Sequence, residues 1–184
     1  IDKDKLYAFL REMEFNRLLS SVISAYGEPE LSGSIDEKKI KEKQQAISKK
    51  NYHLITNLDQ IDEWIKEAEE VGEVAVDTET SSLDAHQADL IGVSLSSKIG
   101  KACYIPIGHK SSKCLKKDDV IKKLKPLLED PSVKKIGQNI KFDFIVLYKH
   151  GITISSMEDT MLMSYVLDAG KNRHNMDTLS EIHL

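Results

Sequence analysis

The sequence has few cysteines, no excess of positive charge and no long apolar run. Its two cysteines, Cys103 and Cys114, form no CxxC pair, which excludes a disulfide framework and indicates a reducing, cytoplasmic setting. The formal net charge is -4, so no overall positive field draws the chain to nucleic acid. There is no signal-peptide pattern and no run of about 18 apolar residues, so we expect no membrane partner.

What is present is the composition of a globular protein, with 40% hydrophobic and 30% charged residues in 184. Residues 1–26 have helical spacing and are expected to be the helical end of a preceding domain. Residues 27–50 are polar and Lys/Glu-rich, as in a linker, and residues 51–184 are expected to form a compact domain. The chain starts at Ile1 and stops within a helical pattern at Leu184, so we expect a segment of a longer protein.

Residues 51–184 are predicted to form an α/β fold. A short strand at "YHLI" and a helix ending at Gly72 come first. Strands at "EVAVDTE", "ADLIGVSLS" and "KACYIPIG" have short connections and are expected to be antiparallel. Helices over "DDVIKKLKPLLEDP" and "IKFDFIVLYKHG" flank a strand at "VKKIGQN", and a last helix over "SSMEDTMLMSYVLDAG" is expected to start with a capping box from Ser155 to Glu158. This order predicts a mixed sheet flanked by helices.

The stretch "EVAVDTET", residues 73–80, leads an apolar strand into two acids. Side chains at i and i+2 of a strand share a face, so Asp77 and Glu79 face one spot and Thr78 points away. Two carboxylates held this close repel each other, and burial increases the cost. The site therefore either opens to water or holds a cation such as Mg²⁺ or Mn²⁺, which prefer carboxylate oxygens.

On its own this pair has other interpretations. Charged residues are common where a strand end reaches water. A haloacid-dehalogenase-type phosphatase also has an apolar strand leading into two acids, but both are aspartates there, and no later glycine-aspartate motif follows here. A DTG aspartic protease is excluded, because Glu79 stands in place of the glycine.

A third acid lies in "KKIGQNIKFDFIVL". Asn139 and Asp143 are four residues apart at a helix start and so share a face, which Leu147 continues. Taken alone, Asp143 fits equally well an exposed first-turn acid that the helix dipole favours. A D-x-E strand together with an N-x-x-x-D helix is much more specific than either motif and indicates a shared site.

These motifs resemble the 3′–5′ exonuclease domain of bacterial family-A DNA polymerase I, in the DEDD superfamily with a ribonuclease-H-like fold. "VDTETSSLD" is similar to the first motif and "KIGQNIKFD" to the second. "YIPIGH", "LKPLLEDP", "EDTMLMSYVLDAG" and "RHNMDTLSE" resemble the segments between motifs. The resemblance covers residues 51–184, and residues 1–26 resemble more weakly the chain that follows a 5′-nuclease domain.

The resemblance implies proofreading: hydrolysis of the 3′-terminal phosphodiester of DNA with two metal ions, Mg²⁺ or Mn²⁺, releasing nucleoside monophosphates. It gives Asp77 the role of bridging both metals, Glu79 that of binding the tighter one, and Asp143 that of holding the second through water. The family's fourth acid lies four residues after a tyrosine. Tyr165 is followed by Ala169 at that spacing, so we expect this motif beyond Leu184 and weak or no activity from the segment alone.

The resemblance also implies substrate-binding residues. Leu83 is expected either to wedge against the terminal base or simply to pack in its loop, and Thr80 to approach the terminal nucleotide. Gln138 and Asn139 are expected to bond either to the substrate or within the second-motif turn. The partners implied are a single-stranded DNA 3′ end and the polymerase and 5′-nuclease domains of the same chain, in the bacterial cytoplasm.

Two other functions remain open from the sequence. One is a related 3′–5′ exonuclease that trims RNA, because it shares the acidic motifs. The other is a non-catalytic spacer between nuclease and polymerase domains. Asp77, Glu79 and Asp143 are all present, which argues against the spacer.

Overall fold

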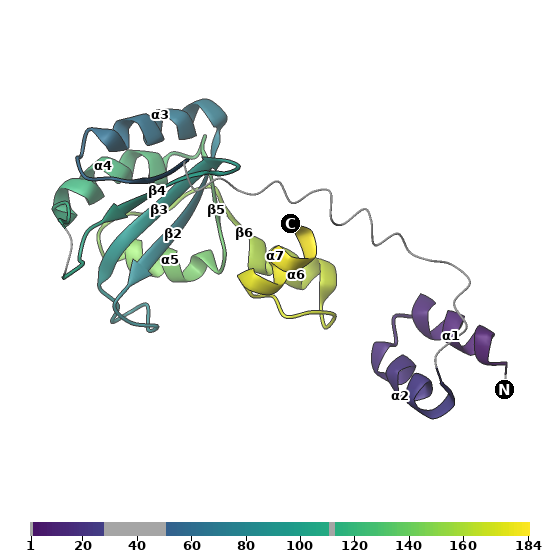
Figure 1. Cartoon of the computed structure of the whole chain (residues 1–184). Helices are drawn as coiled ribbons and strands as arrows, with labels where there is room; N and C mark the ends of the chain where they lie inside the picture. The colour runs from purple at the N-terminus through teal and green to yellow at the C-terminus, as the bar shows by residue number, and fades with distance from the viewer. Residues whose placement is uncertain (1, 28–50, 111–112) are drawn as a thin grey trace. The chain divides into compact units, whose positions relative to one another are not determined.

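The computed structural model describes residues 2–27, 51–110 and 113–184 (Figure 1). The chain divides into two compact units, Ile1–Gln44 and Gln45–Leu184. The described part of the first unit consists of α1 (Lys3–Glu12) and α2 (Asn16–Tyr26). A turn at Glu14, with φ of 55°, separates these helices, and the Tyr7 hydroxyl donates to the Gly27 carbonyl at 2.6 Å. The predicted linker lies outside the described residues except for Gly27.

The described part of the second unit is built on a mixed sheet of six strands in the order β1-β4-β3-β2-β5-β6. The strands are β1 (Tyr52–Leu54), β2 (Glu73–Thr80), β3 (Leu90–Lys98), β4 (Lys101–Pro106), β5 (Lys134–Gly137) and β6 (Met157–Asp159). As predicted, β2, β3 and β4 are antiparallel. The pairs β1–β4, β2–β5 and β5–β6 are parallel, so β2 lies at the junction between the two halves of the sheet.

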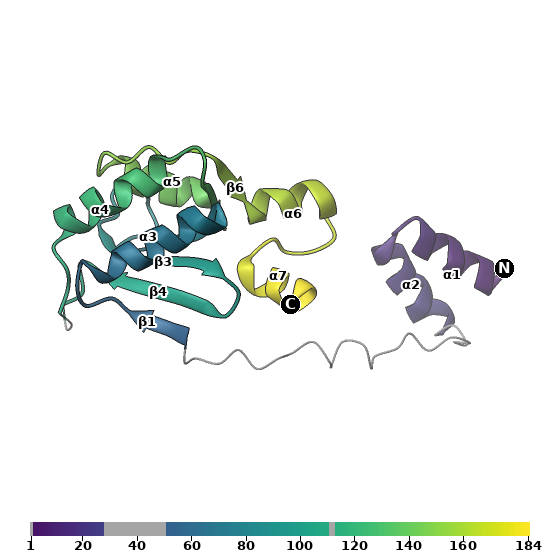
Figure 2. The ribbon, with the colours of Figure 1, turned by 90° about the horizontal axis from the view of Figure 1, so that it is seen from above.

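The hydrophobic core lies between the sheet and the helices α3 (Gln60–Val71), α4 (Lys117–Glu129) and α5 (Ile140–Tyr148) (Figure 2). Burial alternates strictly along β2, so that Val74, Val76 and Thr78 are buried while Asp77 and Glu79 are exposed. This alternation is the period-2 pattern read from the sequence. It places the two acids of β2 on the opposite face from the core.

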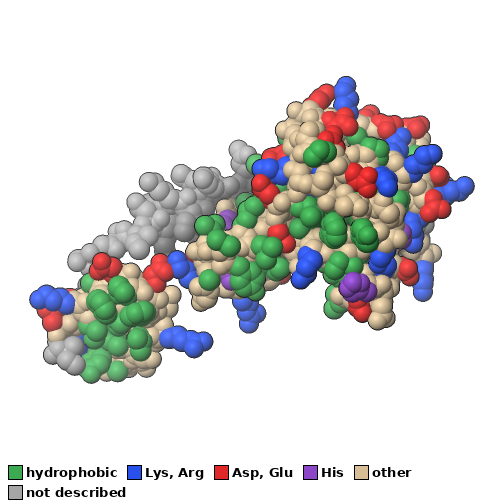
Figure 3. All heavy atoms as spheres, turned by 180° about the vertical axis from the view of Figure 1, so that it is seen from behind, with side chains coloured by type: hydrophobic (Ala, Val, Ile, Leu, Met, Phe, Trp, Pro, Cys, Tyr) green, Lys and Arg blue, Asp and Glu red, His purple; other side chains and the backbone are tan. Residues whose placement is uncertain are grey.

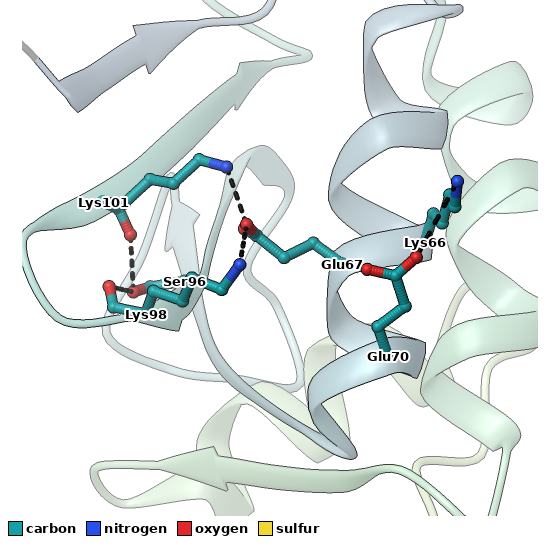
Figure 4. A network of polar contacts seen from close by, with 6 residues as sticks. All are labelled: Lys66, Glu67, Glu70, Ser96, Lys98 and Lys101. Atoms are coloured by element: carbon teal, nitrogen blue, oxygen red, sulfur yellow. Dashed lines mark hydrogen bonds and ion pairs between the residues drawn. The ribbon is translucent and has the colours of Figure 1, made fainter.

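Helix α3 is joined to the β3–β4 hairpin by a polar network as well as by the core. One carboxylate oxygen of Glu67 lies 2.8 Å from the amines of both Lys98 and Lys101 (Figure 4). The amine of Lys101 also lies 4.9 Å from the ring centre of Trp64. The two lysines, Lys101 first, lower the pKa of Glu67. This network fixes the helix to the end of the sheet remote from the acids.

The capping box predicted at Ser155–Glu158 is wrong. Residues Met157 to Asp159 form β6, which pairs with β5, and α6 (Thr160–Asp168) begins only afterwards. The N-cap is Asp159, whose side chain accepts hydrogen bonds from the backbone N–H groups of Met161 and Leu162. Pairing in the sheet decided this boundary, because it uses backbone groups that the predicted helix would have needed.

Asp159 caps a second helix too. Its Oδ1 accepts from the N–H of Asn139 and its Oδ2 from the N–H of Ile140, each at 3.0 Å. The side chain is buried, and the positive ends of two helices meet on one carboxylate. The start of α5 is thereby fixed to β6 and α6.

An apolar groove of about 760 Å³ lies between α5, β6 and α6. Leu162, Met163, Val166 and Leu167 line it and are exposed, and Figure 3 shows hydrophobic side chains gathered on this side. The acids at this groove are engaged elsewhere, Glu158 with Lys134 and Asp159 with the two helix starts. Both acids at the groove therefore already have polar partners.

The chain ends with α7 (Met176–His183). In the described ranges, no helix has the length and apolarity that crossing a bilayer requires.

We expect Asp159→Ala to lower the free energy of unfolding of the second unit by about 2–4 kcal/mol, roughly twice the cost of losing one helix cap. Four backbone N–H groups lose their side-chain acceptor. Urea unfolding followed by the fluorescence of Trp64, the single tryptophan, measures the change. The control is Asp59→Ala, because Asp59 stands at the N-cap of α3 without a side-chain cap bond. Equal effects of the two substitutions would contradict the double cap.

Candidate active site

A polar cavity of about 520 Å³ opens at the end of β2. Its walls come from β2, the loop that follows β2, the turn after β5, and α5. Every site residue predicted from the sequence lines it: Asp77, Glu79, Thr80, Leu83, Gln138, Asn139 and Asp143. Two separate stretches of sequence, residues 77–83 and 138–143, therefore meet at one opening.

The first two acids lie on the open face of the sheet, as the strand periodicity predicts. Asp77 and Glu79 are both exposed, while Thr78 between them is buried. Partial burial, and then the neighbouring charge of Glu79, raise the pKa of the Asp77 carboxyl. Holding the negative charges of Asp77 and Glu79 here therefore costs free energy, and a bound cation would remove that cost.

Asp143 reaches β2 from the side of β5. The register of β2 with β5 ends where Ala75 faces Ile136, and the N–H of Thr78 lies beyond that end. The Oδ1 of Asp143 accepts hydrogen bonds from the backbone N–H of Thr78 at 2.8 Å and from its hydroxyl at 2.5 Å. The acid on α5 therefore takes the place of a strand partner beside Asp77.

Thr78 is a site residue that the sequence analysis missed. Strand periodicity predicts only that Thr78 points away from the two acids, which is correct, but that buried side is where Asp143 binds. A buried hydroxyl needs a hydrogen-bond partner, so a threonine on the covered side of a strand was the available signal.

The Asp143 carboxyl is 3% exposed, and its pKa is raised to about 6. Burial is the main cause, and the charge of Asp77 adds to it. The two bonds from Thr78 act in the opposite direction because they favour the ionised form. Both Asp77 and Asp143 line the same cavity, and their like charges disfavour ionisation of both.

The turn from β5 into α5 is shaped by Gln138 and Asn139. Asn139 has a left-handed backbone, with φ of 58°, which asparagine tolerates better than most residues. The Gln138 amide donates to the carbonyl of His174 at 2.7 Å and accepts from the Thr160 hydroxyl at 2.5 Å. Gln138 thus has a structural role that ties the turn to α6 and the chain before α7.

The loop after β2 carries Leu83 at its tip. Lys149, just beyond α5, donates to the carbonyls of Ala85 at 3.3 Å and Ala88 at 2.6 Å, which holds the base of the loop. The Thr80 hydroxyl donates to the Ser82 carbonyl at 2.9 Å. Leu83 itself is 98% exposed, so it does not pack within the loop.

The donor atoms fit a divalent cation only in part. Among the described residues, no group of three or more His, Cys, Asp or Glu side chains is placed to hold a metal together. The interacting carboxylates of Asp77, Glu79 and Asp143 are nevertheless hard oxygen ligands of the kind that Mg²⁺ and Mn²⁺ prefer.

Residues 52–184 match the family described as 3′–5′ exonuclease, so the chain belongs to this family of exonuclease domains. DNA polymerase I of Rhizobium leguminosarum is 44% identical over 151 residues, which are 71% of this chain and 15% of that protein. DNA polymerase I of Pseudomonas aeruginosa is 38% identical over 184 residues, 97% of this chain and 19% of that protein. The chain therefore spans less than a fifth of these relatives.

Solved nucleases share the fold. Brucella melitensis NrnC bound to pGG has a TM-score of 0.52 at 29% identity, over 72% of this chain and 60% of that one. Trypanosoma brucei RNase D in complex with GMP has a TM-score of 0.53 at 14% identity, over 64% and 36%, and shows the fold alone. The predicted ribonuclease-H-like α/β sheet and the exonuclease resemblance are confirmed.

We expect Asp143→Asn to stabilise the metal-free chain at pH 8 by about 1–3 kcal/mol, at 1.36 kcal/mol for each unit of pKa. The folded pKa of Asp143 is about 6, above its ordinary 3.8. The folded state therefore binds the proton more tightly, and the free energy of unfolding falls as the pH rises from about 4 through 6. Asparagine keeps an oxygen for both Thr78 bonds without the charge.

Urea unfolding in EDTA at pH 4.5 and pH 8 measures this gain. The control is Asp177→Asn, which removes an exposed charge from α7. A gain at pH 4.5 as large as that at pH 8 would show that ionisation of Asp143 is not its cause.

Proposed function

We propose that residues 51–184 are the proofreading 3′–5′ exonuclease domain of a bacterial DNA polymerase I. Its reaction is hydrolysis of the 3′-terminal phosphodiester of single-stranded DNA, with release of nucleoside monophosphates. The observation that carries the proposal is the binding of Asp143 to the strand segment between Asp77 and Glu79. The polymerase relatives supply the biological setting.

The proposed cofactors are two divalent ions, Mg²⁺ or Mn²⁺. Asp77 would be a ligand of both ions, Glu79 of one and Asp143 of the other. When bound, such ions lower the pKa of an attacking water and stabilise the charge on the leaving oxygen. The raised pKa values of Asp77 and Asp143 support this assignment, since a cation offsets the repulsion that causes part of each shift.

The remaining residues act on the DNA end in this proposal. Leu83, exposed at its loop tip, wedges against the terminal base. Thr80 and Asn139 face the cavity and contact the terminal nucleotide, while Gln138 supports the turn that carries Asn139. Thr78 orients Asp143 through two hydrogen bonds, and this keeps the acid beside Asp77 before any ligand arrives.

The domain assignment extends to the rest of the chain. We assign residues 1–26 to the end of a preceding 5′-nuclease domain and residues 27–50 to a linker. A polymerase domain and the fourth acidic ligand complete the proposed protein in the bacterial cytoplasm.

A 3′–5′ exonuclease that trims RNA is the second candidate, favoured by the likeness to NrnC. The DNA polymerase relatives are more similar in sequence, at 44% and 38% against 29% identity. DNA is therefore the proposed substrate.

The test replaces the matching segment of the Pseudomonas aeruginosa polymerase with these 184 residues, so that the host chain supplies the rest of the protein. With Mg²⁺ or Mn²⁺, we expect stepwise shortening of a 5′-labelled single-stranded DNA from its 3′ end. Asp77→Ala should reduce the rate at least about 100-fold because it removes a ligand of both proposed metals. Asp59→Ala, which removes an exposed acid at the N-cap of α3, is the matched control.

Three results would contradict the proposal. Activity that survives Asp77→Ala refutes the mechanism. Faster shortening of an RNA strand of the same sequence favours the RNA-trimming candidate. No shortening by the unsubstituted chimera, with its polymerase activity intact, favours a spacer.

A further inference from the structure

A gap in the side-chain pattern lies directly opposite Glu79. In the β2–β3 register Glu79 faces Gly92, and facing residues in an antiparallel pair have Cβ atoms about 4.5–5.5 Å apart on the same face of the sheet. Gly92 has no side chain, so the position beside the Glu79 carboxylate is left to another residue.

Tyr104 of β4 fills this position. It faces Ser94, two residues from Gly92 on the same face of β3, and its ring lies diagonally over the glycine. A Cβ atom on Gly92 would lie 1.9 Å from the Tyr104 hydroxyl, so only glycine allows this placement. The hydroxyl thus occupies the place of a cross-strand partner of Glu79, within reach of a glutamate side chain.

His109 fixes the hydroxyl from the other side. Its Nε2 lies 2.6 Å from the Tyr104 oxygen, and the two rings meet edge to face with centres 5.6 Å apart. The backbone N–H of His109 donates to the Sγ of Cys114 at 3.2 Å, which holds the main chain of His109 in place. Burial, followed by the charge of Glu79, raises the pKa of Tyr104, so the phenol remains a proton donor at neutral pH.

We propose that Tyr104 is a positioning residue for Glu79: His109 donates from Nε2 to the phenol oxygen, and the phenol donates its proton to the Glu79 carboxylate. This rests on the proposed function, in which Glu79 is a metal ligand. The bond orients one carboxylate oxygen and leaves the other for the cation. Partners of this kind around a metal ligand typically account for 10–100-fold in metal affinity.

The test is Mn²⁺ binding to the 184-residue chain, followed by electron paramagnetic resonance. Tyr104→Phe should weaken binding about tenfold. In a Glu79→Gln background the same change should have no further effect, because the phenol acts through that carboxylate. The matched control is Tyr148→Phe, an exposed tyrosine of α5 that should leave affinity unchanged.

Two variants test the direction of the hydrogen bonds. His109→Ala should weaken binding as Tyr104→Phe does, and His109→Gln should restore part of it, since the amide also donates. Nitrogen-15 spectra, assigned by the signal that His109→Gln removes, should show His109 protonated at Nε2. Urea midpoints in EDTA separate these effects from a loss of folding.

The outcomes distinguish this role from the metal site itself. Absence of Mn²⁺ binding by the unsubstituted chain, or binding that survives Asp77→Asn, overturns the metal site and the role of Tyr104 with it. Binding that needs Asp77 but is unchanged in Tyr104→Phe overturns the role of Tyr104 alone. A His109 ring protonated at Nδ1 also overturns it, because the phenol would then donate to the histidine.

Discussion

Two hydrogen bonds from Thr78 to one oxygen of Asp143 join strand β2 to helix α5 across 65 residues of sequence. They form because β5 stops pairing with β2 at Ala75, which leaves the next part of that edge to a side chain. The carboxylate that fills it belongs to a helix whose first turn is fixed by Asp159. The end of one strand pairing and the cap of one helix together place the third acid beside the first two.

The ionised carboxylates of the site destabilise the folded state. Burial and mutual repulsion raise the pKa values of Asp77 and Asp143, so their ionised forms are disfavoured in the absence of a cation. Unfavourable carboxylates that converge in a cavity are typical of functional sites. The apolar groove beside α6 is larger, but its acids are already paired or capping helices, so it offers no such chemistry.

The two faces of the sheet have different roles. The covered face carries the core and, through Thr78, the contact to Asp143. The open face carries Asp77, Glu79 and Tyr104, whose alignment follows from the antiparallel register of β2, β3 and β4. Gly92 faces Glu79 in the β2–β3 register, and its missing side chain lets the Tyr104 ring lie over this position.

Local sequence features alone determined that Asp77 and Glu79 share a face, that the helix before β2 stops at Gly72, and that β2, β3 and β4 are antiparallel. These follow from the geometry of one strand, one helix or one short connection. Tertiary structure decided the partner of Thr78, the double cap at Asp159 and the place of Tyr104. It also decided that α6 is capped by Asp159 and not by the predicted capping box. Each of these depends on residues that lie far apart in the sequence: on where a distant strand ends, or on which side chain reaches an N–H group. Local periodicity in the sequence does not determine such contacts.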